Sequence, residues 1–231
     1  MTKSWRDEKR LLYIRNLKSA SSSIVHFLRR NQLRFDTFTY LDSDDKPFQK
    51  GFLGLYSPEE IDINHYRFIF TIVRDPFKRA WSAYTHLKQV NTNRFKNPNP
   101  NRELPTFKLW ETFEDFLKCH IEINNLVDRR VDMHMKTQSS YLNDFKKLYP
   151  DQDVYIDKVS NLDNFYKFLH EQYPSNISVE RETTRRNVGE GRRYDTSYID
   201  NYTKITRDLV LERYAEDFDN FNFSKDLKLN E

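Results

Sequence analysis

Cysteine, glycine and long apolar runs are all scarce in this chain. The one cysteine, Cys119, has no second thiol for an intrachain disulfide and offers no zinc-binding set. Only four glycines occur among 231 residues, which argues against long flexible linkers. No window approaches the roughly eighteen apolar residues of a membrane-spanning helix, and the first residues form no signal-like apolar run. We therefore expect no membrane span and no secretory signal.

The charge balance is close to neutral, and aromatic residues are abundant. The chain has 38 lysines and arginines against 35 aspartates and glutamates, a net charge of +3 at pH 7, which argues against a nucleic-acid-binding surface. Its 14 tyrosines and 18 phenylalanines can build a sizeable core. The length suits one α/β domain, and no repeat or boundary is visible, so we predict a single domain over residues 1–231.

A lysine and five small residues follow a short apolar run near the N-terminus. The run Leu11–Ile14 indicates a strand, and an apolar pattern with helical spacing begins at Ile24. Small side chains let backbone N–H groups approach an anion, and the start of a helix adds free donors and positive potential. This is not the Walker type of loop, because no GxxxxGK[ST] run occurs and the lysine comes first. We predict a phosphate-binding loop made of Lys18, Ser19, Ala20, Ser21, Ser22 and Ser23.

A second strand candidate ends in an arginine. Tyr66–Val73 is rich in β-branched and aromatic residues, and a helical pattern begins after Pro76. The Arg-x-Pro break places Arg74 at the carboxyl end of a strand, where open α/β sheets bind ligands. Ser82 lies about two turns into the helix. An arginine and a hydroxyl in these positions can bind a second phosphate, with the guanidinium acting as a planar fork.

Strands and helices alternate along the rest of the chain. We expect further strands near Phe38–Leu41 and at Val154–Ile156, and helices over 106–122, 139–149, 161–170 and about 197–214. Residues 91–105 and 174–196 have no periodicity and indicate long loops. The alternation predicts a central parallel sheet with helices on both faces.

Together, these segments resemble the sulfotransferases that use 3'-phosphoadenosine 5'-phosphosulfate (PAPS), most closely the carbohydrate-type family 2. The loop at 18–23 is similar to their 5'-phosphosulfate loop, and residues 74–84 are similar to their 3'-phosphate element RDPxxRxxSxY. Three later segments agree in order: Asp132–Ser139 with D-x-H-x-x-P-Q-S, Val154–Leu162 with their late strand and loop, and Tyr214–Phe221 with YxxDFxxF. Departures at Leu17, Thr137 and Ser160 remove no phosphate-binding group.

The resemblance implies a P-loop-NTPase-like sulfotransferase fold. It also implies transfer of a sulfuryl group from PAPS to a hydroxyl of a carbohydrate acceptor, a glycan or glycolipid, with 3'-phosphoadenosine 5'-phosphate (PAP) as the product. Lys18 is then catalytic, because it stabilises charge on the leaving phosphate. We expect no metal, since no His/Cys/Asp cluster has metal-ligand spacing. Many relatives carry an N-terminal membrane anchor, and its absence here implies a cytoplasmic member.

The general base for the acceptor hydroxyl has two candidate regions. His134 is the histidine inside a family-like motif, with Asp132 and Gln138 nearby, and a structural role is its alternative. We interpret His86, in a helical pattern, as a packing or surface residue. The interval between the two phosphate loops offers the other candidates: Asp42, Asp44, Asp45, Glu59, Glu60 and His65.

An arginine-rich loop supplies further cofactor candidates. Arg185, Asn187 and Arg192 fall where family members close a late loop over the nucleotide and its 3'-phosphate. A solvated basic loop is the alternative interpretation for each of them.

Two other classes of function compete with sulfuryl transfer. One is a nucleotide-dependent kinase of the same superfold, and the other is a non-catalytic module that binds nucleotide or sulfated glycan. The kinase is disfavoured, because the Walker lysine–Ser/Thr pair and a clear Mg²⁺-binding aspartate are missing.

Overall fold

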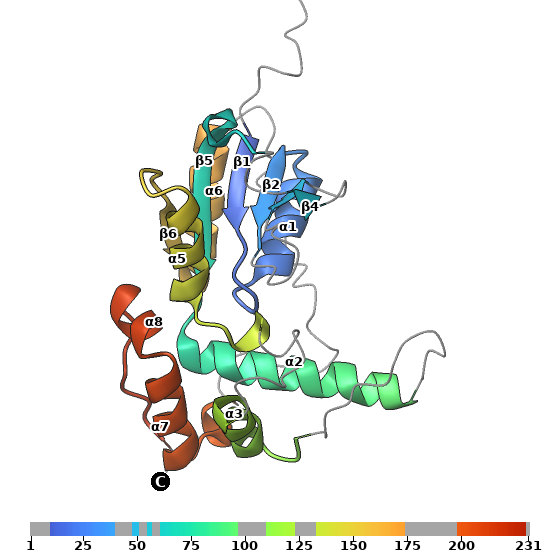
Figure 1. The fold of residues 1–231 in the computed structure, drawn as a ribbon, viewed down its shortest axis with the longest axis vertical. Helices are drawn as coiled ribbons and strands as arrows, with labels where there is room; N and C mark the ends of the chain where they lie inside the picture. The colour runs from blue at the N-terminus through green and yellow to red at the C-terminus, as the bar shows by residue number, and fades with distance from the viewer. Residues whose placement is uncertain are drawn as a thin grey trace, which may run out of the picture. The chain divides into compact units, whose positions relative to one another are not determined.

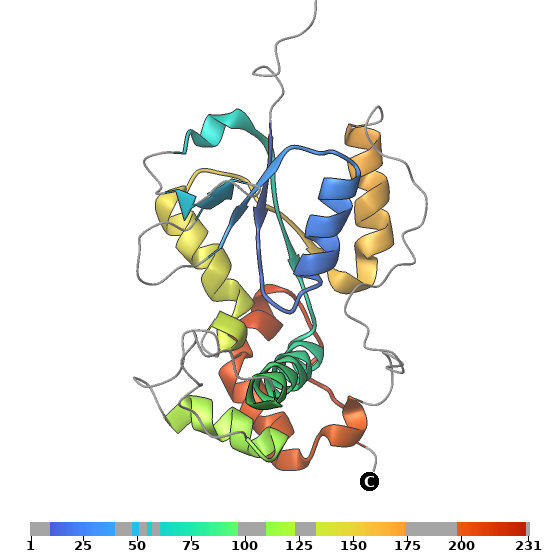
Figure 2. The same cartoon turned by 90° about the vertical axis from the view of Figure 1, so that its right-hand side faces the viewer.

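The computed structural model describes residues 10–39, 48–50, 55–56, 61–96, 110–122, 133–173 and 198–229. The chain forms two compact units (Figures 1 and 2). The first consists of Met1–Arg74 with Ser140–Asn187, and the second of Asp75–Ser139 with Val188–Glu231. That residues 1–231 act as one sulfotransferase domain stays a prediction.

A six-stranded sheet with the order β4-β3-β2-β1-β5-β6 is the centre of the first unit. Its strands are β1 (Arg10–Ile14), β2 (Phe35–Phe38), β3 (Phe48–Lys50), β4 (Leu55–Tyr56), β5 (Tyr66–Val73) and β6 (Tyr155–Lys158). The four strands β2, β1, β5 and β6 are parallel, which confirms the predicted central parallel sheet. The short strands β3 and β4 extend it in antiparallel fashion, which the sequence analysis did not anticipate.

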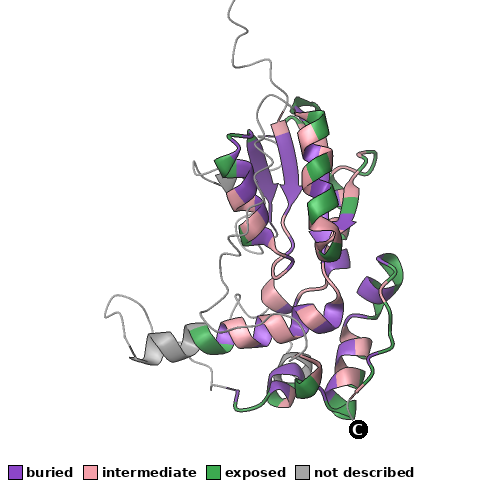
Figure 3. Ribbon diagram, turned by 180° about the vertical axis from the view of Figure 1, so that it is seen from behind, coloured by how far each residue is buried: buried purple, intermediate pink, exposed green. Residues whose placement is uncertain are grey.

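Helices cover both faces of this sheet, as predicted (Figure 2). Helices α1 (Ser21–Arg30) and α6 (Leu162–Gln172) pack on one face, where Tyr13 and Phe70 stack with ring centroids 4.9 Å apart. Helix α5 (Gln138–Leu148) packs Tyr141 and Phe145 on the other face. Because both faces are covered, β1 and β2 are buried along almost their whole length (Figure 3).

Strand β2 begins three residues before the expected strand near Phe38–Leu41, and it contains a buried aspartate. Asp36 is 1% exposed, accepts a hydrogen bond from the Tyr66 hydroxyl at 2.9 Å and forms an ion pair with Arg10 at 3.1 Å. These partners lie on β1, which is next to β2, and on β5, which is on the far side of β1, so a polar residue is satisfied inside the sheet. Burial and the Asp36 carboxylate in turn raise the pKa of the Tyr66 phenol above its usual range.

The second unit is built from helices. They are α2 (Pro76–Lys96), α3 (Phe113–Glu122), α7 (Lys204–Arg213) and α8 (Ala215–Asn220). Phe77, Ala80, Tyr84 and Leu87 place an apolar stripe of helical spacing on α2, and it packs against the other helices in one aromatic-rich core. The segment expected as one helix over about 197–214 forms two elements in the structure: a 3-10 turn at Ile199–Asn201, then α7.

Two residues of the Arg-Asp-Pro motif define the start of α2. The Asp75 carboxylate accepts a hydrogen bond from the Lys78 amide at 2.9 Å, which is the geometry of an N-cap. Pro76 is the first helical residue, where its missing N–H has no intrahelical partner to lose. The aspartate and proline thus begin the helix, and the arginine before them remains at the end of the strand.

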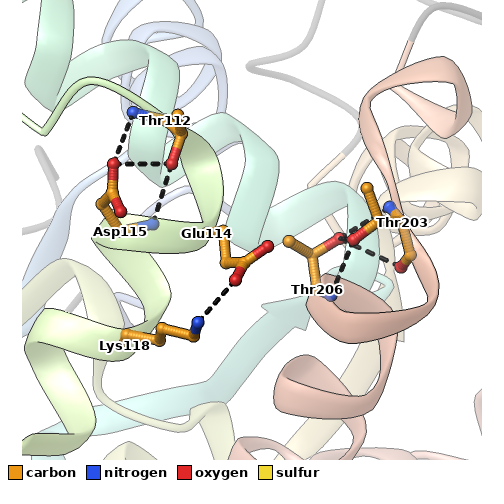
Figure 4. A network of polar contacts seen from close by, with 6 residues as sticks. All are labelled: Thr112, Glu114, Asp115, Lys118, Thr203 and Thr206. Carbon is orange, nitrogen blue, oxygen red and sulfur yellow. Dashed lines mark hydrogen bonds and ion pairs between the residues drawn. The ribbon is translucent and has the colours of Figure 1, made fainter.

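Threonine-based caps begin α3 and α7 (Figure 4). At α3, the Thr112 hydroxyl and amide donate to the Asp115 carboxylate at 2.7 and 3.1 Å, which lowers the pKa of Asp115. At α7, the Thr203 hydroxyl accepts from the Thr206 amide at 3.2 Å, and the Thr206 hydroxyl accepts from the Thr203 amide at 2.8 Å. Both caps satisfy backbone donors that helix ends leave unpaired.

Replacing Thr203 by Ala should therefore destabilise the protein by about 1 kcal/mol, because the Thr206 amide at the start of α7 loses its partner. Urea unfolding measures this change. Thr85→Ala is the matched control, since the Thr85 hydroxyl bonds carbonyls of its own helix α2, those of Trp81 at 3.1 Å and Ser82 at 3.4 Å, and its loss should be neutral or slightly stabilising. Equal unfolding free energies for the Thr203 variant and wild type would contradict the role of the cap.

Candidate active site

Strands β1 and β5 are neighbours at the point where the order of strand addition to the sheet reverses. The chain leaves β1 for β2 on one side and later returns to β5 on the other side of β1. β1 and β5 are parallel neighbours, with Ile14 opposite Thr71, so their carboxyl ends lie at the same edge (Figure 1). Open α/β sheets bind ligands at such a point. The Lys18 loop follows β1 here, and Arg74 follows β5.

The loop between β1 and α1 has an unusual backbone conformation. Lys18 and Ala20 have φ angles of 67° and 58°, in the left-handed region that favours glycine. Ser19 between them does not share this conformation. Left-handed residues in a tight turn can direct successive N–H groups to one side, where they bind an anion. Non-glycine residues in such conformations are typical of sites where the surrounding structure holds strain for a function.

The start of α1 adds donors next to this loop. Ala20 is the N-cap residue, and no side chain caps the helix. The first turn contains no acidic residue, so its positive end is not neutralised locally. Ser22 is exposed and Ser23 is partly exposed, whereas Ser19 and Ser21 are buried. Ser22 and Ser23 can therefore present hydroxyls to a ligand, while Ser19 and Ser21 contribute chiefly backbone and packing.

Hydrogen bonds with Thr71 of β5 and with Arg74 hold the loop in place. The Asn16 side chain, which is 1% exposed, donates to the Thr71 hydroxyl at 2.8 Å, and that hydroxyl donates to the Ile14 carbonyl at 2.9 Å. Arg74 donates from Nη1 to the Lys18 carbonyl at 3.2 Å. The structure thus brings together Lys18 and Arg74, two site residues predicted from separate parts of the sequence.

A third cation stands at the same edge and was missed in the sequence. Lys158 ends β6 and lies opposite Val73, the residue before Arg74. Three adjacent strands, β1, β5 and β6, therefore each carry a cation at or just beyond their carboxyl ends. The available signal was a lysine two residues after the predicted strand Val154–Ile156. Its neighbour Asp157 fixes the following turn, accepting from the Lys158 amide at 2.7 Å and from Asn161 at 2.9 Å.

In the second unit, His134 is half-buried in a short helical turn and stacks on His86 of α2. Their ring centroids are 5.2 Å apart and the ring planes are 27° from parallel. His86 was interpreted as a packing or surface residue, and the structure makes it the neighbour of His134. Ser82 lies on α2 one turn before His86, on the same side of the helix. No local sequence pattern indicates this pairing, because the two histidines are far apart along the chain.

The remaining predicted residues are either exposed or outside the described parts of the chain. His65 is exposed and lies 3.5 Å from the Asp62 carboxylate. Asp132 lies outside the described residues, and so do the late-loop candidates Arg185, Asn187 and Arg192. The acidic candidates of the interval after β2 also lie outside them: Asp42, Asp44, Asp45, Glu59 and Glu60.

Among the described residues, no group of three or more His, Cys, Asp or Glu side chains is arranged to hold a metal ion. Within the same residues, no helix combines the length and apolar character needed to cross a bilayer.

Comparison with known proteins gives one family. The model of the sulfotransferase family matches residues 5–224, which include the Lys18 loop, the Arg74 element and the His134 segment. Searches of curated proteins and of solved structures gave no match. The match covers nearly the whole chain, and the central parallel sheet with flanking helices agrees with it. The chain therefore belongs to the sulfotransferase family, as a member of family 2.

Proposed function

We propose that this protein transfers a sulfuryl group from PAPS to a hydroxyl of a carbohydrate acceptor. The observation that carries the proposal is the strained Lys18 loop joined to Arg74 at the carboxyl ends of β1 and β5. That arrangement supplies two cations and a set of backbone donors where family membership expects a doubly anionic nucleotide.

The 5'-phosphosulfate is the expected ligand of the loop at 18–23. Its backbone amides and the start of α1 would bind the phosphate oxygens, with Ser22 and Ser23 as the accessible hydroxyls. Lys18 would lie near the bridging oxygen, where negative charge grows as the sulfur–oxygen bond breaks. A fixed ammonium at this point favours the transition state over the ground state.

The 3'-phosphate is the expected ligand of Arg74 and Ser82. Arg74 donates to the Lys18 carbonyl at 3.2 Å, which holds its guanidinium beside the loop, and a guanidinium binds phosphate as a planar fork. Lys158, at the end of the adjacent strand, adds positive charge to the same sheet edge. We further propose that Arg185, Asn187 and Arg192 contact the nucleotide from the late loop.

On the acceptor side, His134 is the proposed general base. Its imidazole would take the hydroxyl proton as the acceptor oxygen attacks sulfur. The carbohydrate assignment rests on the likeness of residues 132–139 to the family 2 motif. We propose that the reaction needs no metal, because Lys18 and the helix terminus can balance the charge of a sulfuryl group.

Calorimetry and a transfer assay test the function directly. PAP should bind, whereas ATP with Mg²⁺ and heparin should bind much more weakly. Labelled PAPS offered with a panel of sugar acceptors should yield a sulfated product, and excess EDTA should not stop the transfer. Preferential binding of ATP with Mg²⁺ would favour the kinase, and binding of heparin without transfer would favour the non-catalytic module.

Replacing Lys18 by Ala should slow sulfuryl transfer about 10²-fold or more, the scale for losing one charge-stabilising group. The physical reason is the loss of the ammonium beside the leaving phosphate. Initial rates with saturating PAPS measure the effect. Lys147→Ala is the matched control, because the Lys147 side chain is 76% exposed at the end of α5. A Lys18 variant with a rate within a few-fold of wild type would refute the assignment.

Replacing Arg74 by Ala should weaken PAP binding by roughly 1.5–3 kcal/mol, and Ser82→Ala by about 0.5–1.5 kcal/mol. Binding of 5'-AMP, which has no 3'-phosphate, should change less, with a small loss for Arg74→Ala because the Lys18 carbonyl loses its donor. Calorimetry with both ligands gives the comparison, and Arg207→Ala, on α7, is the control for removing an arginine. If PAP and 5'-AMP lose equal affinity, these residues do not bind the 3'-phosphate.

A further inference from the structure

Two buried charged side chains hold the segment that carries His134. Arg79 of α2 and Asp217 of α8 are both 0% exposed. Each binds the backbone of residues 136–139, which lie more than fifty positions away from both in the sequence.

Asp217 holds the end of this segment. Its carboxylate accepts hydrogen bonds from the backbone amides of Gln138 at 2.9 Å and Ser139 at 2.7 Å. These amides belong to the first turn of α5, which has no earlier carbonyl to bind. A buried carboxylate needs such compensation, and charge-assisted bonds to a helix start provide it. Asn220 adds a hydrogen bond to the Ser139 hydroxyl at 3.1 Å.

Arg79 holds the middle of the segment. Its Nη2 atom donates to the Lys136 carbonyl at 2.6 Å, and its guanidinium lies 5.6 Å from the centroid of the Tyr214 ring. Burial raises the pKa of the Tyr214 phenol, so this ring stays neutral beside the cation. The Tyr214 hydroxyl in turn donates to the Met135 sulfur at 3.5 Å.

His134 sits directly beside these fixed points. The residue after it, Met135, is fully buried, and the next residue is bound by Arg79. The His134 ring stacks on His86, which lies on α2 two turns after Arg79. Helix α2 therefore anchors the backbone of the segment and also supports the ring, so both the position and the plane of the imidazole are constrained.

We infer that Asp217 is a positioning residue for acceptor activation, acting through His134. This rests on the proposed function. In the transfer, the acceptor oxygen forms a bond to sulfur, and the sulfur–oxygen bond to the 5'-phosphate breaks with its electron pair going to that phosphate. The hydroxyl proton passes to the His134 imidazole. A base must lie within hydrogen-bonding reach of the hydroxyl, and displacement by about 1 Å can cost about 100-fold in rate.

Asp217→Asn is the first test. Asp219→Asn is the matched control, since it makes the same chemical change at an exposed position of α8. Asp217→Asn should lower kcat by about 10- to 100-fold. The dissociation constant for PAP should stay within about 2-fold, because Asp217 binds the backbone of Gln138 and Ser139 on the proposed acceptor side. A thermal melt accompanies each variant. A folded Asp217→Asn protein with wild-type kcat, or with PAP affinity lost in proportion to kcat, overturns the inference.

A double-mutant cycle with His134→Ala provides the readout that a merely structural role would not give. If Asp217 acts through His134, adding Asp217→Asn to the His134→Ala variant should change kcat by no more than about 2-fold. Multiplying losses would overturn the inference. Should Asp217→Asn fail to fold, Arg79→Lys replaces it in the cycle with the same expectation, because lysine lacks the guanidinium that reaches Lys136.

The outcomes separate this inference from the proposed function. A wild-type protein that transfers nothing from PAPS refutes the proposed function. A wild-type protein that transfers sulfuryl, combined with a fully active His134→Ala variant, leaves the transfer standing and refutes the role of Asp217.

Discussion

The parallel pairing of β1 with β5 is the constraint on which the rest of the site depends. It brings the carboxyl ends of two strands, more than fifty residues apart in sequence, to the same edge of the sheet. The Thr71 hydroxyl joins them a second time, because it donates to the Ile14 carbonyl of β1 and accepts from Asn16 in the loop. A shift of this register by one residue would turn Thr71 to the opposite face and separate the loop from its anchor.

Local sequence patterns predicted the parts of the site that depend on local structure. Strand, small-residue loop and helix follow one another within twenty residues at Lys18, and the Arg-Asp-Pro motif combines a strand end, an N-cap and a first helical residue. The central parallel sheet followed from the alternation of these units. Each of these predictions used information contained in one short window.

The features that sequence analysis missed are contacts between distant residues. Strand β2 was misplaced because Asp36 looks like a loop residue until Arg10 and Tyr66 are seen beside it. The neighbour of His134 was missed because His86 shares no motif with it, and Lys158 was missed because only strand order puts it next to Arg74. The C-terminal motif was recognised as a pattern, but its pattern does not say that Asp217 binds the start of α5. Strand pairing and burial determine these contacts, and local composition does not predict either of them.

A glycine-poor chain must hold its phosphate loop by other means. Lys18 and Ala20 adopt left-handed conformations that cost about 1–2 kcal/mol each for residues with a side chain. The neutral hydrogen bond of Asn16 contributes about 0.5–1.5 kcal/mol, and the charged one of Arg74 about 1.5–3 kcal/mol. These contributions are of the same size as the strain, so the loop can be held in its binding conformation before an anion arrives. A ligand then finds donors already oriented and need not spend its binding free energy on ordering them. The arginine at the end of β5 thus also stabilises the loop itself, independently of any phosphate that it binds.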